Sequence, residues 1–189
     1  MTTRLPRRPN HGRNLRPSRG FSLVDLLCVT GIAAVLLGQS LPLLLQTQQR
    51  QSLMSAAAQL ETDLQLARSQ AQTLDRSVRL SLQHPEGGGA CYALYTGPAE
   101  GCSCDADGQT QCVAGAQLLR AQGLPAVAGV QLASPDRTLT FDAGKGTVTP
   151  TATLVLSDRD GRAVHQIVNV LGRIRSCSPT ALGGLPRCR

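Results

Sequence analysis

The chain has 189 residues and a formal net charge of +7, but much of the charge lies at one end. Residues 1–20 hold six arginines and no acidic residue, and the remaining 13 basic side chains nearly balance the 12 acidic ones. This near balance excludes a uniformly basic nucleic-acid coat protein and leaves room for a local basic patch. With no Trp, two Tyr and two Phe, the composition argues against an aromatic platform for stacking bases.

An apolar segment follows the arginines. Leu26–Leu45 carries no charge, and twenty helical residues at about 1.5 Å each span roughly 30 Å, the thickness of the hydrocarbon core of a bilayer. The preceding arginines would hold that end in the cytoplasm. An ordinary secretory signal peptide is the alternative, but no small-x-small cleavage site follows the segment. We therefore predict that residues 21–45 stay in the mature protein as a membrane helix.

The start of the apolar segment contains one acidic residue, Asp25. A carboxylate within a membrane helix costs about 2.5–3.5 kcal/mol and needs a charged partner. If the chain were cut after Gly20, the new α-amine of Phe21 would lie within one helical turn of Asp25. The amine of a neighbouring subunit could serve instead in an assembly.

These residues resemble a known signature. The segment from Gly20 to Leu26 reads G-F-S-L-V-D-L, similar to the G-F-T-L-I-E-L of the class III leader of type IV pilins and pseudopilins. The resemblance implies that prepilin peptidase removes residues 1–20 after Gly20 and methylates Phe21. It also implies that Asp25, one methylene shorter than the usual Glu, serves in assembly with other minor and major pilins or pseudopilins.

Beyond the membrane segment, the helix is predicted to continue to Leu74. Apolar residues recur at alternating spacings of four and three, which marks one face of a helix: Leu53, Ala57, Leu60, Leu64, Ala67, Ala71 and Leu74. A continuous helix from Phe21 to Leu74 would measure about 80 Å. We expect its apolar stripe to pack on a sheet.

The rest of the chain is predicted to form strands separated by Gly, Pro and Asp turns. The expected strands are 78–83, 91–95, 130–132, 138–141, 152–156 and 164–170, and residues 96–126 are expected to be irregular. A long helix followed by antiparallel strands is an α+β arrangement, and it resembles the pilin-like fold of the FimT/GspH branch. The predicted organisation is a cleaved leader (1–20), the membrane half of the helix (21–45) in the inner membrane, and a periplasmic domain (46–189) that includes the rest of the helix.

Six of the seven cysteines fall in the predicted periplasmic part, the exception being Cys28. They are Cys91, Cys102, Cys104, Cys112, Cys177 and Cys188. An even number in an oxidising compartment predicts disulfides. Cys177 with Cys188 would close a short C-terminal loop, and the other four leave three pairings open.

No cofactor, metal or catalytic site is predicted. The one-residue gap between Cys102 and Cys104 is tighter than the usual spacing of zinc ligands, and the sequence around Asp105 and Asp107 does not complete a calcium loop. The sequence contains no Gly-x-Ser-x-Gly, His-Glu-x-x-His or phosphate-binding glycine loop. These observations predict a non-enzyme.

The C-terminal end is basic. Residues 161–189 contain no acid and five arginines, namely Arg162, Arg173, Arg175, Arg187 and Arg189. The segment from Gly172 to Arg175 resembles the Gly-Arg-x-Arg motif that is associated with DNA binding during uptake in FimT-type minor pilins. Strand alternation would place Arg173 and Arg175 on one face, where two guanidiniums could contact neighbouring phosphates. The alternative is that these arginines only solvate a strand edge.

The sequence thus predicts a minor type IV pilin that joins or primes a pilus tip and binds DNA through phosphate contacts. Two other classes stay open. One is a structural tip subunit of a pilus or of a type II secretion pseudopilus, with no DNA contact. The other is an adhesin-like module whose cysteine-rich loop binds an unidentified ligand.

Overall fold

The computed structural model describes residues 22–86, 88–180 and 182–188. By their internal contacts, the residues divide into two compact units, Met1–Pro42 and Leu43–Arg189. The predicted cleavage and methylation residues, Gly20 and Phe21, lie outside the described residues, as does Arg189.

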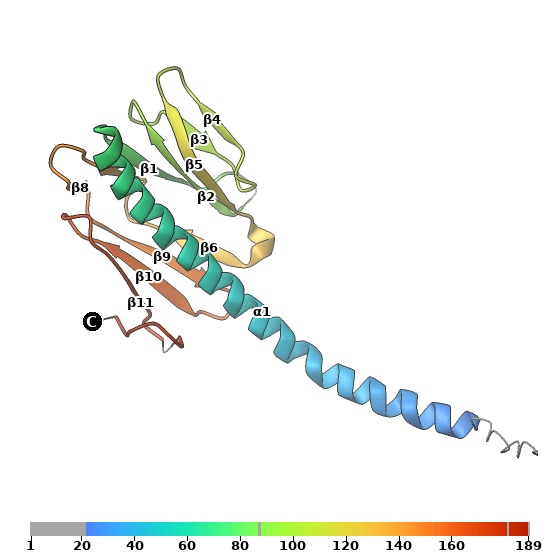
Figure 1. The fold of residues 1–189 in the computed structure, drawn as a ribbon. Coiled ribbons are helices and arrows are strands. Elements are labelled where there is room, and N and C mark those ends of the chain that lie inside the picture. The colour runs from blue at the N-terminus through green and yellow to red at the C-terminus, as the bar shows by residue number, and fades with distance from the viewer. Residues whose placement is uncertain (1–21, 87, 181, 189) are drawn as a thin grey trace, which may run out of the picture. The chain divides into compact units, whose positions relative to one another are not determined.

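The elements of the described chain begin with one long helix and continue with short strands (Figure 1). They are α1 (Leu23–Leu74), β1 (Val78–Gln83), β2 (Ala90–Thr96), β3 (Cys102–Cys104), β4 (Thr110–Cys112), β5 (Gln117–Leu124), η1 (Ala126–Ala128), β6 (Val130–Ala133), β7 (Thr138–Phe141), β8 (Val148–Thr149), β9 (Ala152–Asp158), β10 (Ala163–Val168) and β11 (Ile174–Cys177). This arrangement confirms the predicted α+β, pilin-like fold class. In the described part of α1, no stretch is both long enough and apolar enough to cross a membrane.

The apolar stripe of α1 faces the core of the second unit. Leu53, Leu60 and Leu64 are fully buried, as the spacing of four and three predicts. Full burial of such a side chain contributes about 1.5–3 kcal/mol. Leu74 is an exception at 41 % exposure, so the buried stripe ends one turn earlier, at Ala71.

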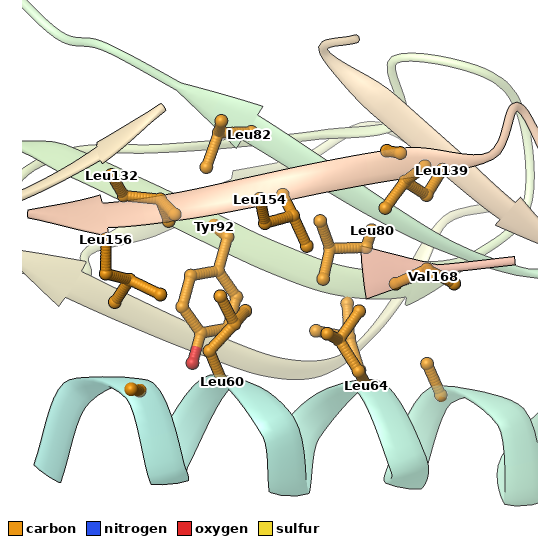
Figure 2. Close-up of a cluster of buried hydrophobic side chains, with 14 of the residues drawn as sticks. Leu60, Leu64, Leu80, Leu82, Tyr92, Leu132, Leu139, Leu154, Leu156 and Val168 are labelled. Atoms are coloured by element: carbon orange, nitrogen blue, oxygen red, sulfur yellow. The ribbon is translucent and has the colours of Figure 1, made fainter. Parts of the chain in front are cut away.

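Two antiparallel sheets pack with the helix. One has the strand order β5-β2-β1-β7-β8 and the other the order β11-β10-β9-β6. The core lies between the helix and both sheets, and Figure 2 shows Leu60 and Leu64 of α1 pointing towards side chains of both, such as Leu80 and Leu154. In β9, buried and half-buried residues alternate regularly, because one face of the strand packs on this core.

The cysteine-rich segment was expected to be irregular, and that prediction is wrong. It contains β5, which extends the five-stranded sheet beside β2, and the short hairpin β3–β4. The hairpin covers the outer face of that sheet, where the Gln83 side chain donates to the Cys102 carbonyl at 3.2 Å and accepts from the Cys104 amide at 3.0 Å. Every residue of β2 is therefore buried. The hairpin strands are three residues long, too short for periodicity to show.

Three disulfides link the six cysteines that were predicted to pair. Cys177–Cys188 is the predicted bond. Among the other four cysteines, the structure selects Cys91–Cys104 and Cys102–Cys112. The first links the hairpin to β2, and the second joins the two strands of the hairpin. The disulfides therefore hold the β3–β4 hairpin over the sheet.

Candidate functional site

A tight turn between β10 and β11 presents the first arginine of the Gly-Arg-x-Arg motif. The Gly172 amide donates to the Asn169 carbonyl at 2.9 Å, and the Arg173 amide donates to Asn169 Oδ1 at 2.8 Å. Gly172 has φ +67°, a left-handed conformation that glycine adopts without steric cost. These bonds fix the backbone from which the Arg173 side chain projects.

The two motif arginines do not share one strand. Because β11 begins at Ile174, the prediction that Arg173 lies in the strand is wrong. Ile174 packs against the core, and the Ser176 hydroxyl donates to Glu61 of α1 at 2.6 Å. These alternate residues face the helix, so Arg175 projects from the opposite face of the strand. Arg173 and Arg175 are both exposed.

A shallow groove of about 390 Å³ runs between α1 and the β10–β11 turn. Its lining residues are Gln65, Arg68, Ser69, Gln72, Gly172, Arg173 and Ile174. None of them is acidic, and Arg68 adds a second guanidinium to that of Arg173. Arg68 was not among the residues that the sequence predicted to bind DNA. Residues 65, 68, 69 and 72 are polar and lie on one face of the helix, and this pattern could have indicated a polar site there.

The other C-terminal arginines differ in their surroundings. Arg162 binds Asp158 through Nε at 2.6 Å and Asp160 through a terminal nitrogen at 2.8 Å, so two carboxylates offset its charge within the β9–β10 turn. Arg187 is exposed. Among the described residues, neither Arg173 nor Arg175 forms an ion pair. The structure therefore separates the motif arginines from Arg162, which the sequence had grouped with them.

Arg187 belongs to a C-terminal loop that the Cys177–Cys188 disulfide closes. The loop packs on the domain through Leu182, which is 5 % exposed. His165 lies beside the disulfide, and its ring nitrogens and the two sulfurs form the one group of three potential metal ligands among the described residues. Both sulfurs are bonded to each other, so they are not available as the thiolates that a metal needs.

The carboxylate of Asp25 lies at the start of α1. It accepts a hydrogen bond from the Ser22 amide at 3.4 Å, while the Ser22 hydroxyl accepts one from the Val24 amide at 3.4 Å. This reciprocal pair is a capping arrangement at the N-terminus of a helix. Asp25 is exposed.

A buried polar cluster joins α1 to the five-stranded sheet. Asp63 of α1 is 1 % exposed, and it accepts from the Tyr92 hydroxyl at 2.7 Å and from Gln59 Nε2 at 3.1 Å. Arg120 of β5 lies 3.1 Å from the same carboxylate. Burial, and then the hydrogen bond to Asp63, raise the pKa of Tyr92 above its usual value. Sequence reasoning missed this cluster because its members are far apart in the chain.

The profile of the type II transport protein GspH matches residues 56–172, more than half of the chain. No curated protein sequence gives a significant match.

Two solved structures are similar. The type IV minor pilin FimU of Pseudomonas aeruginosa is 24 % identical, with a TM-score of 0.49 over 68 % of this chain and 90 % of FimU. The minor pseudopilin EpsH of the Vibrio cholerae type 2 secretion system is 16 % identical, with a TM-score of 0.46 over 67 % of this chain and 96 % of EpsH. The chain has a long helix packed against antiparallel sheets. Together with the profile match, this shows that it belongs to the FimT/GspH family of minor pilins and pseudopilins.

Proposed function

We propose that this protein is a minor type IV pilin that joins or primes the pilus tip and holds DNA there through phosphate contacts. The observation that carries the DNA proposal is the exposure of Arg173 and Arg175 with no ion pair among the described residues. Their charges are free to attract a phosphate backbone, whereas that of Arg162 is offset by Asp158 and Asp160.

The leader signature supports the assembly proposal. Prepilin peptidase would cut after Gly20 and methylate Phe21, and the apolar residues 21–45 would anchor the chain in the inner membrane with its domain in the periplasm. Asp25 would pair with the α-amine of Phe21 or with that of a neighbouring pilin. Its exposed carboxylate and single 3.4 Å contact with the Ser22 amide are compatible with such a partner.

The DNA should bind with little sequence preference. Phosphate contacts carry no base information, and the chain has few aromatic side chains for stacking. Each phosphate contact releases counterions, so affinity should fall steeply with salt. For a single subunit we expect a dissociation constant of about 10⁻⁴–10⁻⁶ M, the range of non-specific binders, and tighter binding where several subunits act together.

The test is titration of a fluorescent duplex with the purified full chain in mild detergent at two salt concentrations. The variant R173Q/R175Q should lose most binding, because both exposed side chains act on DNA and neither supports the fold. R162Q should lose less DNA affinity, since the charge of Arg162 is already offset. R187Q should also lose less, because Arg187 acts only as a flanking charge. Saturable binding that is equal in wild type and R173Q/R175Q would refute the role of the motif.

A structural pseudopilin of a type II secretion system is the second candidate function. It is favoured by the match to the GspH profile, and it needs no DNA contact. Deletion of the gene separates the two functions: loss of pili or of DNA uptake supports the pilin, and loss of protein secretion supports the pseudopilin.

A further inference from the structure

The groove between α1 and the β10–β11 turn brings together two arginines that are far apart in the sequence. Arg68 comes from the helix and Arg173 from the turn. We infer that this groove binds one phosphate group of a DNA strand, held between Arg68 and Arg173; the inference rests on the proposed DNA binding.

The side chains of the groove suit an anion. Two arginines line it, the amides of Gln65 and Gln72 can donate further hydrogen bonds, and within the described part of the chain no carboxylate lines it. A guanidinium presents its N–H groups in a planar fork that matches two oxygens of one phosphate. Most of its lining residues are exposed, so a phosphate within a polymer can reach them without threading.

Gly172 packs against Arg68. A Cβ atom at this position would lie 3.4 Å from both Cδ and Nε of Arg68 and 3.3 Å from Cγ2 of Val148. The stem of Arg68 thus packs directly over the turn glycine, which is buried. The glycine of the motif thus contacts an arginine of the helix, which lies beside Arg173 in the groove lining.

The same geometry distinguishes the two motif arginines. Arg175 projects from the strand face opposite Ile174 and Ser176 and does not line the groove. Arg68 and Arg173 therefore act on one phosphate, and Arg175 acts on another. The effects of substituting Arg68 and Arg173 on the free energy of DNA binding should therefore not be additive, because the two residues share a partner. The effects of substituting Arg68 and Arg175 should be additive.

The test compares R68Q and R173Q with R137Q in the full chain, by duplex titration over a range of salt. Arg137 is an exposed arginine of the β6–β7 connection, so R137Q makes the same change of charge away from the groove. We expect R68Q and R173Q each to weaken binding about tenfold at low salt and to lower the salt slope by about one. R137Q should change binding little, and R68Q/R173Q should be weakened by less than the product of the two single effects.

A pair of glycine variants tests the packing without removing a charge. Gly172 and Gly146 have similar backbone angles, φ +67° and +62°, but a Cβ at Gly146 meets nothing within 4 Å. G172A should therefore lose more thermal stability than G146A, because its Cβ would also lie 3.3 Å from Cγ2 of Val148. DNA binding should persist in both variants, because neither removes a charge and a Cβ 3.4 Å from Arg68 is in ordinary contact with it.

The outcomes separate this inference from the proposed function. If the wild type binds DNA and R173Q weakens it while R68Q behaves like R137Q, the groove inference is overturned and the DNA-binding function stands. If the wild type does not bind DNA, both are overturned. Vesicles containing phosphatidylglycerol supply the same phosphate chemistry. Because residues 21–45 would insert into any bilayer, they are compared with phosphatidylcholine vesicles; a preference for phosphatidylglycerol that R68Q removes, in the absence of DNA binding, would also overturn the assignment to DNA.

Discussion

Replacement of Asp63 by Ala should strongly destabilise the domain, because Asp63 is the centre of the buried cluster that joins α1 to the sheet. Its carboxylate accepts hydrogen bonds from Tyr92 at 2.7 Å and Gln59 at 3.1 Å and forms an ion pair with Arg120 at 3.1 Å. A hydrogen bond to a charged group contributes about 1.5–3 kcal/mol, and a buried hydroxyl left without a partner costs about 1–3 kcal/mol. Arg120 adds little to this cost, because its side chain is 44 % exposed and can turn to water.

Together these contributions give a loss of about 3–5 kcal/mol for D63A, the range expected when one partner of a buried pair is removed. For a domain of this size the melting temperature should fall by roughly 6–20 °C. R120Q should cost less, about 1 kcal/mol, because the Asp63 carboxylate keeps its bonds to Tyr92 and Gln59.

The assay is urea and thermal unfolding of the full chain in mild detergent, followed by circular dichroism. D107A is the matched control, since Asp107 is an exposed aspartate in the turn between β3 and β4. If D63A loses no more stability than D107A, or if R120Q loses more than D63A, the buried carboxylate is not the centre of the cluster.

Four further predictions follow from particular residues. Y92F should lower the free energy of unfolding by about 1–3 kcal/mol, because it removes a hydrogen bond to Asp63. Y95F should be neutral or slightly stabilising, because the buried Tyr95 hydroxyl has no hydrogen-bond partner among the described residues. Equal losses of stability in the two variants would contradict this. Since the pKa of Tyr92 is raised above 10.0 in the folded state, its contribution to stability is fully present below pH 10 and is lost at higher pH, so unfolding midpoints should fall more steeply with alkaline pH in wild type than in Y92F. Peptide mapping without reduction should find Cys177 joined to Cys188, and C177S/C188S should lose about 2–5 kcal/mol; free thiols at both positions would show that the loop is open. N-terminal sequencing should give a mature start at Phe21, and D25A should be cleaved but assemble poorly, whereas a start after Leu45 would identify an ordinary signal peptide.

The sequence by itself determined the features that depend on local patterns. The stripe from Leu53 to Ala71 indicated both the helix and its buried face, because helical periodicity is visible within a few turns. Most strands of the two sheets were predicted from alternating apolar residues between Gly, Pro and Asp turns, which are also local patterns. The Cys177–Cys188 bond followed from a short loop between two late cysteines, and the Gly-Arg-x-Arg segment was recognised from four consecutive residues.

Only the tertiary structure decided what depends on contacts between distant segments. Two of the three disulfides and the hairpin that they hold could not be chosen from spacing, since three pairings of the four cysteines were equally compatible with it. Arg162 looked like Arg173 in sequence, but Asp158 and Asp160 offset its charge. Arg68 is a neighbour of Gly172 because a sheet folds back on the helix. Charge and periodicity can be read along the chain, whereas the partners of a side chain are fixed by packing.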